Sequence, residues 1–375
     1  MAAVSESARA LRWGDYVFAA TTKSSIDLWE EAHLSEAKTL LICGAGFDPR
    51  SLDVPEEVAS QDWPNLTVIA LRPGVSGDHQ QAEENAESNR ARLHELFGAQ
   101  LTVLEPPLVS DPQAAGTLLS RQLVQEFGVL EFQTIIVDMS GLPSSISFVF
   151  LHLLLTEAGP SPKGMTPFKG DLLVTVSEDA AKDARIFASG LGDANTMPGL
   201  PRMPSNARTK IWVPVLGEGA EEELRSLATF ISPGEICPVL PFPSSDPRRA
   251  DDLMLSYRTF LFEEMAFEPR NVLYASETNP FDLYRQLVHL AERYERALQP
   301  LGQTTIIASE HTSKLLSLGV LLASHEANIS IAHVRPTSYR LAEGPTVRAR
   351  PSIYTAWLAG RPYELEPSGS NVVSQ

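Results

Sequence analysis

The densest group of reactive side chains in the sequence is the polar run SEHTSK at 309–314, between the apolar runs TTIIA and LLSLGVLLA. This pattern predicts a loop between a strand and a helix. A lysine in the first helical turn is repelled by the positive helix end unless an anion lies nearby. Lys314, the hydroxyls of Thr312 and Ser313 and the free amides of the helix start would together hold a phosphate, whereas the alternative is an exposed Lys314 that pairs with Glu310. The other predicted members of this site are Ser309 and His311.

A second polar loop is expected at ASETNPFD (275–282), after the apolar run NVLY. Carboxylate, hydroxyl and amide groups gather there, directly before an amphipathic helical pattern. In open parallel sheets, ligands bind beyond the carboxyl ends of the strands. We therefore predict that this loop takes part in ligand binding. Its candidate residues are Ser276, Glu277, Asn279 and Asp282.

A third loop, GAGFDPRS (44–51), follows the apolar run TLLIC. Gly44 and Gly46 permit a tight turn and a close backbone approach, Asp48 could cap a helix or hold a ribose hydroxyl, and Arg50 could meet a phosphate. The pattern lacks the third glycine of the dinucleotide-binding fingerprint, and the next strand ends in Leu-Arg-Pro rather than in an acidic residue. Cofactor binding and a purely structural turn both remain open here.

A fourth loop, VDMSGLPSS (137–145), joins a very apolar strand to an apolar helix. Asp138 terminates the strand and should lie at the functional edge of the sheet. Ser140, Ser144 and Ser145 add hydroxyls near a helix start, whose free amides bind small anions. The alternative is that these four residues only cap the turn.

These loops all belong to a regular alternation of strand and helix patterns. Strands are expected near 39–46, 66–74, 101–107, 134–141, 171–178, 271–275, 304–310 and 329–336. Helices are expected near 80–99, 116–128, 144–159, 281–302 and 312–326. The alternation predicts an α/β fold with mostly parallel sheets covered by helices.

Loop-rich composition interrupts this alternation in the middle of the chain. We predict a Rossmann-like domain over 1–190, a Pro-rich connection over 191–250, a second Rossmann-like domain over 251–362 and a flexible tail over 363–375. Each half has two polar loops that follow a strand and precede a helix. This similarity indicates two Rossmann-like domains related by duplication, although convergence on a common α/β pattern would give the same result.

Composition excludes several classes of function. Forty-seven acidic residues against 30 basic ones give a formal net charge of −17, which disfavours broad nucleic-acid surfaces and anionic membranes as partners. A small anion remains possible, because local cations and helix starts can outweigh a distant net charge. The two cysteines, Cys43 and Cys237, exclude a disulfide scaffold and a Cys-rich metal site, so no metal is expected and a cytoplasmic location is predicted.

The run SEHTSK, with the apolar helix and strand that follow it, resembles the second motif of CARF-type Rossmann-like domains. That family senses cyclic oligonucleotides in prokaryotic antiviral defence, and SAVED domains resemble two CARF units in one chain. The resemblance covers about 70 residues of the C-terminal half, and Glu310 and His311 stand where the family has glycines. On this resemblance the ligand loop matches His311, Thr312, Ser313 and Lys314, and the first-strand loop matches Ser276, Glu277 and Asn279.

A weaker resemblance links GAGFDPR at 44–50 to the first motif of methyltransferases that use S-adenosylmethionine. Two hypotheses of different kinds follow. The preferred one is a sensor or regulatory component that binds a nucleotide-like, phosphate-bearing ligand and works with a protein effector or as a homo-oligomer. The alternatives are a methyltransferase-like enzyme with S-adenosylmethionine as cofactor, and a degenerate Rossmann-like protein that serves interactions alone. The sequence identifies no catalytic residues.

Overall fold

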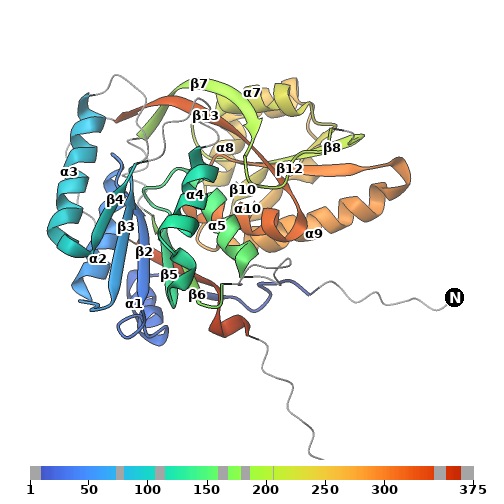
Figure 1. Ribbon diagram of the computed structural model, residues 1–375. Helices are drawn as coiled ribbons and strands as arrows, with labels where there is room; N and C mark the ends of the chain where they lie inside the picture. Colours follow the sequence, from blue (N-terminus) through green and yellow to red (C-terminus); the bar gives the residue numbers. More distant parts are fainter. Residues whose placement is uncertain are drawn as a thin grey trace, which may run out of the picture.

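The computed structural model describes residues 10–72, 80–105, 115–158, 168–178, 186–205, 207–341 and 352–364 (Figure 1). Their strands form two sheets of seven strands each. In the first sheet, the spatial order is β1 (Val17–Ala19), β14 (Ser352–Ala359), β6 (Asp171–Glu178), β5 (Thr134–Asp138), β2 (Thr39–Gly44), β3 (Leu66–Leu71) and β4 (Leu101–Leu104). The strands from β6 to β4 are parallel, while β14 runs antiparallel to both β6 and β1.

The second sheet repeats this arrangement. Its spatial order is β7 (Ile186–Thr196), β13 (Ser330–Leu341), β12 (Thr304–Glu310), β8 (Thr209–Val215), β10 (Val239–Pro241) and β11 (Leu273–Ala275), with the short β9 (Glu235–Ile236) paired to β8. The strands from β13 to β11 are parallel, and β7 is antiparallel to β13. Counted along the chain, and without the short β9, the five parallel strands of each sheet have the Rossmann order 3-2-1-4-5. The predicted α/β class with two mostly parallel, Rossmann-like sheets is thereby confirmed.

The two halves exchange one strand with each other. The strand that follows β6 in the chain is β7, and it pairs with β13 of the second sheet. The strand that follows β13 is β14, and it pairs with β6 of the first sheet. In Figure 1 the long strands β7 and β13 lie together above the helices between the sheets. Each half therefore depends on the other for the strand that completes its sheet.

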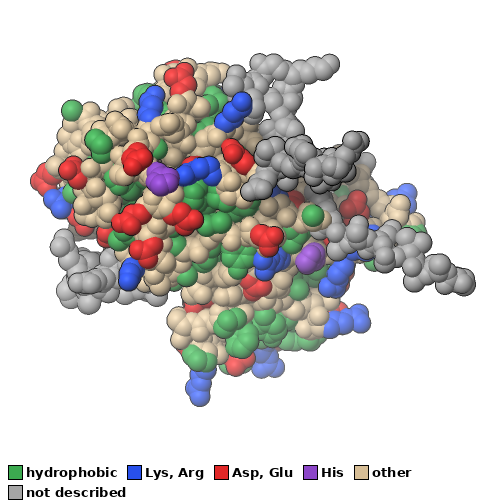
Figure 2. Space-filling view, turned by 90° about the horizontal axis from the view of Figure 1, so that it is seen from below, with side chains coloured by type: hydrophobic (Ala, Val, Ile, Leu, Met, Phe, Trp, Pro, Cys, Tyr) green, Lys and Arg blue, Asp and Glu red, His purple; other side chains and the backbone are tan. Residues whose placement is uncertain are grey.

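Charged side chains cover the surface without gathering by sign on the face that Figure 2 presents. Acidic and basic groups are interspersed there, with apolar patches between them. Elsewhere among the described residues, basic groups are held in ion pairs, such as those of Arg72 with Glu83 and of Arg92 with Glu56. On this face, at least, the surface lacks the continuous basic patch that a nucleic-acid backbone needs.

The helices form three layers around the two sheets. The α-helices of the described residues are α1 (Thr22–Glu31), α2 (Asp53–Ser60), α3 (Gln80–Phe97), α4 (Ala115–Glu126), α5 (Ser144–Glu157), α7 (Glu221–Ile231), α8 (Arg249–Ser256), α9 (Pro280–Leu298) and α10 (Lys314–Ala327). One apolar cluster joins α1, α2 and α3 to the outer face of the first sheet, and another joins α7 and α8 to the second. The largest cluster joins α4, α5, α9 and α10 to both sheets, so these four helices lie between them.

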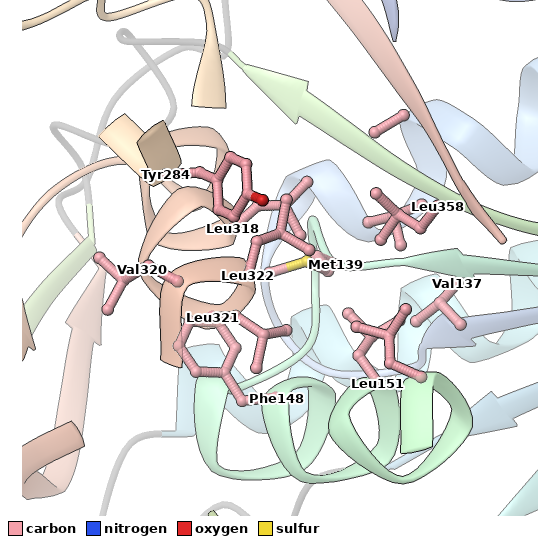
Figure 3. Packing of buried hydrophobic residues seen from close by; sticks show 14 of the residues in the cluster. Val137, Met139, Phe148, Leu151, Tyr284, Leu318, Val320, Leu321, Leu322 and Leu358 are labelled. Atoms are coloured by element: carbon pink, nitrogen blue, oxygen red, sulfur yellow. The ribbon is translucent and has the colours of Figure 1, made fainter. Parts of the chain in front are cut away.

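This shared central layer explains why two helices are apolar on almost every side. In α5 and α10 most residues are buried, which is expected of a helix enclosed by protein. Figure 3 shows Leu318 and Leu322 of α10 close to Met139, which precedes α5, and all three belong to the same buried cluster. Neither helix is long enough to cross a bilayer, and within the described ranges no helix has the length and apolarity of a membrane span.

The observed course of the chain differs in two places from the predicted division. The predicted connection 191–250 contains β8 and α7, which are central parts of the second half. β14, within the predicted C-terminal domain, belongs to the first sheet. Most prolines of the connection lie at or beyond the ends of helices and strands, as Pro233 does after α7, although Pro214 lies within β8. Their number made the segment look like a loop, although it contains regular structure. The return of β14 depends on pairing between distant segments, which composition does not reveal.

Candidate functional site

The loop after β2 is closed by its own hydrogen bonds. The carboxylate of Asp48 accepts from the backbone amide of Arg50 at 2.8 Å and forms an ion pair with its guanidinium, also at 2.8 Å. Asn89 of α3 donates its side-chain amide to the carbonyl oxygens of Gly46 and Asp48. Arg50 is 3% exposed, so these contacts hold the loop from within. The charged groups of Asp48 and Arg50 are therefore paired with each other.

Gly44 has a definite packing role at the end of β2. A Cβ atom at this position would lie 2.5 Å from the carbonyl oxygen of Gly141, in the loop after β5. The second half repeats this contact, because a Cβ on Gly217 after β8 would lie 1.9 Å from the carbonyl oxygen of His311. Both contacts occur where the strand order of a sheet reverses, between β2 and β5 and between β8 and β12. The repeated contact supports the predicted relation between the halves.

Asp138 ends β5 and is completely buried. Its Oδ1 atom accepts hydrogen bonds from the backbone amide and the hydroxyl of Ser140. The Ser140 hydroxyl oxygen in turn accepts from the amide of Ser177 in β6, at 2.8 Å. Burial raises the pKa of Asp138 to about 7, against the lowering effect of the bonds from Ser140. Asp138 and Ser140 therefore organise the loop from inside the sheet.

Helix α10 begins in the loop SEHTSK, as expected. Groups of the protein itself already accept hydrogen bonds from the amides of its first turn. Lys314 is the first helical residue, and the hydroxyl of Ser313 accepts from the amide of Leu316. The amide of Leu315 donates to Oε1 of Glu178 at 2.7 Å. A carboxylate from the end of β6 thus occupies the position expected for an external anion. Any anion that approached α10 would have to share this helix start with Glu178.

Lys314 also joins the two halves. Its Nζ donates to the carbonyl oxygen of Leu142 at 2.9 Å and lies 3.4 Å from Oγ of Ser144. Ser144 is the first residue of α5, as Lys314 is of α10, so equivalent helix starts meet at this point. The residue before α5, Pro143, provides no side-chain cap. The structure therefore brings together the predicted residues Lys314 and Ser144, with Ser145 next in the same helix turn.

Around the same loop, four side chains form a hydrogen-bonded chain. Nε2 of His311 lies 3.0 Å from Oγ of Ser309, and its Nδ1 lies 3.1 Å from a carboxylate oxygen of Glu223 in α7. The indole of Trp212 donates to the same Ser309 oxygen at 3.0 Å. Although the order serine–histidine–glutamate resembles a catalytic triad, Ser309 is fully buried and the His311 side chain is 2% exposed. We assign this group to positioning the loop.

Two polar atoms of the same loop are buried with no hydrogen-bond partner among the described residues. They are Oγ1 of Thr312 and Oε2 of Glu310. Buried polar atoms are normally satisfied by protein or by a bound molecule. These atoms lie on either side of His311 in sequence, within four residues of Lys314. They are the side-chain atoms of this loop for which the described residues provide no hydrogen-bond partner.

The loop after β11 is committed to contacts within the protein. Glu277 pairs with Arg249 and accepts from Ser245. Asn279 caps α9 and donates to the phenol oxygen of Tyr16. The carboxylate of Asp282 accepts a hydrogen bond from the backbone amide of Ser276. The structure thus does not place these four predicted residues with Lys314.

Sequence reasoning missed Glu178, Glu223 and Trp212. Glu178 terminates the apolar strand DLLVTVSE, so the rule that selected Asp138 would have found it. Glu223 lies in a run of three glutamates at a helix start, a pattern that is normally solvated. Trp212 lies within the apolar run of β8 and carries no sign of a polar contact. Only the first of these had a usable signal.

Comparisons with known proteins add little to this description. No protein-family model and no curated protein matches the chain. Among solved structures, it is similar to one described as a universal stress protein from Pseudomonas aeruginosa UCBPP-PA14, at 12% identity over 80% of this chain and 94% of the other, with a TM-score of 0.22. A functionally unknown protein from Pseudomonas aeruginosa PAO1 matches at 12% identity over 81% and 95%, with a TM-score of 0.23. A universal stress protein from Archaeoglobus fulgidus matches at 10% identity over 78% and 94%, with a TM-score of 0.22. Likeness at these scores carries no argument about this chain.

Proposed function

We propose that this protein binds a small phosphate-bearing ligand of the nucleotide type where α5 and α10 begin, and that it acts as a sensor or regulatory component. The observation that carries the proposal is the position of Lys314. Lys314 is the first residue of α10, and its ammonium group lies at the start of α5, beside Ser144. Two positive helix ends and a lysine side chain thus converge on one small region.

Such a convergence favours an anion. Pro143 gives α5 no side-chain cap, but its carbonyl oxygen accepts from the amides of Ile146 and Ser147, so the first-turn amides that would face an anion are those of Ser144 and Ser145. Together with the hydroxyls of Ser144 and Ser145 and the ammonium of Lys314, they form a set of donors suited to a phosphate. The unpartnered hydroxyl of Thr312 adds a donor from the second half. These donors would attract a phosphate at short range despite the net charge of −17, because salt screens the more distant negative charges.

Glu178 would act as a competitor for the same region. Its carboxylate holds the amide of Leu315, and a phosphate that approaches α10 would have to displace or repel it. Because Glu178 belongs to the first half and Leu315 to the second, such a displacement would alter a contact between the halves. A ligand that binds better when this contact is broken would increase the share of molecules in that conformation. Such a ligand-dependent change of conformation is the basis of a sensor. The resemblance to CARF and SAVED domains, and with it a role in antiviral defence, stays a prediction.

The proposal is tested by identifying and measuring the ligand. Small molecules released from the purified, denatured protein are analysed by mass spectrometry, and calorimetry is run with pyrophosphate, ATP and cyclic di- and trinucleotides. We expect one phosphate-bearing compound to bind, and Lys314→Ala to weaken its binding at least tenfold, as is typical for loss of a charged hydrogen bond. Release of no such compound, together with no binding of any probe, would refute the proposal.

A matched lysine provides the control. Lys210 also donates to a backbone carbonyl, that of Ile231 at 2.8 Å, but it lies at the opposite end of the second sheet. Lys210→Ala should leave the affinity unchanged. Glu178→Gln should increase the affinity, because it removes the competing negative charge while it keeps an oxygen for Leu315. Equal effects of Lys314→Ala and Lys210→Ala would contradict the site.

A further inference from the structure

A groove on the outer side of the second half lies apart from the junction of the two helix starts. One wall is α7, and the other is η5 (Thr259–Glu264), the short helical segment that follows α8. Both walls belong to the layer on the opposite face of the second sheet from α5 and α10. The groove has a volume of about 350 Å³, and its lining residues are Arg225, Ala228, Thr229, Phe260, Glu264 and Met265.

An irregular backbone shapes one wall of this groove. η5 is wound as a π-helix, and the amide of Met265 donates to the carbonyl oxygen of Phe260, five residues earlier instead of four. The next residue, Ala266, has a φ of +46°, which is rare for a residue other than glycine. Single π-helical turns and strained backbone positions concentrate at functional sites. The groove thus coincides with a part of the second half that departs from regular helix geometry.

The floor of the groove is apolar and firmly packed. Phe260 is 1% exposed, and its ring lies edge to face with that of Trp212 in β8, with the two centroids 6.1 Å apart. Ala228 and Met265 pack against the same apolar cluster but are only partly buried. The unbranched side chain of a methionine adapts to partners of different shape, and the residue is common at binding surfaces for this reason. The groove therefore offers apolar surface that the described residues leave uncovered.

The rim of the groove carries a surplus of negative charge. The guanidinium of Arg225 lies 2.8 Å from carboxylate oxygens of both Glu221 and Glu264, so this cation is already neutralised. Glu222 and Glu263, which adjoin these two carboxylates in the sequence, are exposed and have no ion-pair partner among the described residues. The rim therefore attracts a cationic partner and repels an acidic one.

We propose that this groove binds a basic amphipathic helix of a partner protein. Arg225, Ala228 and Thr229 follow one another at spacings of three and one along α7, so they lie on one side of it and the groove follows its axis. Two neighbouring helical walls form a seat for a third helix, whose side chains enter the space between them. An apolar side chain of the partner would contact Phe260 and Met265, while its lysine or arginine side chains would face the acidic rim.

The size and the opening of the groove support a peptide rather than a small molecule. Its volume is near the lower limit of the roughly 300–1,000 Å³ that is typical of pockets that enclose a small ligand. The side chains of Arg225 and Glu264 are 42% and 38% exposed, so the groove is open along its rim. Such a partner is the effector through which a sensor would act. Its binding does not require the phosphate-bearing ligand, so failure of either proposal leaves the other standing.

Two synthetic peptides test the chemistry of the partner. Both are amphipathic helices of about 18 residues with the same leucine face, and the polar face carries lysine in one peptide and glutamate in the other. Fluorescence anisotropy measures their binding to the full-length protein at about 150 mM salt, without any nucleotide. We expect the lysine peptide to bind with a Kd of about 10–100 μM and the glutamate peptide not to bind. Equal binding of the two peptides, or binding of neither, overturns the proposal.

Two lysine variants locate the bound peptide. Thr229 is exposed at the rim, and its hydroxyl donates to the carbonyl oxygen of Arg225, four residues earlier. Thr229→Lys adds a positive charge there and should weaken binding of the lysine peptide about tenfold. The matched control is Thr156→Lys, because Thr156 of α5 is also exposed and donates to the carbonyl oxygen of His152, four residues earlier. Since both variants change the net charge equally, equal losses would show that the peptide responds to overall charge, and the groove would be excluded.

A variant that fills the groove tests the apolar contact. Ala228→Leu adds apolar volume between the walls without a change of charge, so it should also weaken binding of the lysine peptide about tenfold. Thermal unfolding verifies that each variant is folded. Unchanged affinity in folded Ala228→Leu overturns the proposal. If the unmodified protein dimerises and Ala228→Leu dissociates the dimer, the groove is occupied by a second copy of this chain and the proposal is likewise wrong.

Discussion

Replacing His325 with glutamine should remove much of the acid sensitivity of the contact between the halves. Nε2 of His325 lies 2.9 Å from Nη1 of Arg12, and because arginine can only donate, this nitrogen accepts. The proton of His325 is therefore on Nδ1, which lies 3.3 Å from Nδ1 of His152 in α5. Both histidines are consequently neutral in the folded protein. Protonation of either ring would break one bond of this chain.

The effect of pH follows from the lowered pKa. Burial, followed by His152 and Arg12, lowers the pKa of His325 from 6.5 to about 3. Below pH 6.5 the unfolded chain therefore binds a proton that the folded chain does not bind, and stability falls as the pH falls. For one such histidine, the free energy of unfolding should decrease by about 2 kcal/mol between about pH 7.5 and pH 5. Burial also lowers the pKa of His152, which acts in the same direction.

The variant His325→Gln separates this contribution from those of other groups. The glutamine side chain can still accept from Arg12, but the variant loses the ring contact with Trp13, whose centroid lies 6.1 Å from that of His325. We expect a loss of about 1 kcal/mol at neutral pH. Since the variant lacks the titration of His325, it should become the more stable protein at about pH 5. Urea unfolding of both proteins across this pH range measures the two free energies.

The control is an exposed histidine. His94 lies on the outer side of α3, and His94→Gln should give a curve parallel to that of the unmodified protein. If the difference between His325→Gln and the unmodified protein is the same at both ends of the pH range, His325 is not held neutral by the contacts described. The reasoning from Arg12 and burial would then be wrong.

Two further predictions concern the packing of the loops and the exchanged strand. Gly217→Ala should destabilise the protein by about 2 kcal/mol or more, because the new Cβ meets the carbonyl oxygen of His311. Gly219→Ala, which meets nothing within 4 Å but has a φ of +75°, should cost about 1 kcal/mol, and equal losses in thermal unfolding would contradict the close contact. Truncation after residue 351 removes β14 and should expose the amides of β6 and β1 to hydrogen exchange, although both strands lie far earlier in the chain. Unchanged protection of β6 would show that the first sheet does not need the exchanged strand.

Several features of the site could be predicted from local sequence. The start of α10 at Lys314, with Ser313 as its cap, follows from the change from polar to apolar residues. The position of Asp138 at the end of a buried strand follows from the run TIIVD. These features depend on residues within a few positions of one another, which is the range over which strand and helix patterns act. The alternation of these patterns likewise predicted the class of the fold.

The partners of those groups could not be predicted in the same way. Glu178 meets Leu315 across 137 positions, and Lys314 reaches Leu142 across 172. No local pattern specifies such pairs, because they depend on how two sheets pack against one helical layer. The anion that the sequence demands near Lys314 is partly provided by Glu178, and only the folded chain shows this.

The sequence by itself determined the alternating strands and helices, the polar loops at strand ends and the apolar helices α5 and α10, because each depends on the local order of side chains. The tertiary structure alone decided that β7 and β14 are exchanged, that the helix starts at Ser144 and Lys314 meet, and that α7 and η5 form the walls of one groove. The physical reason is that hydrogen bonding between strands is the same for every sequence that can form a strand. Which strands pair is therefore settled by the burial of the whole chain rather than by any one segment.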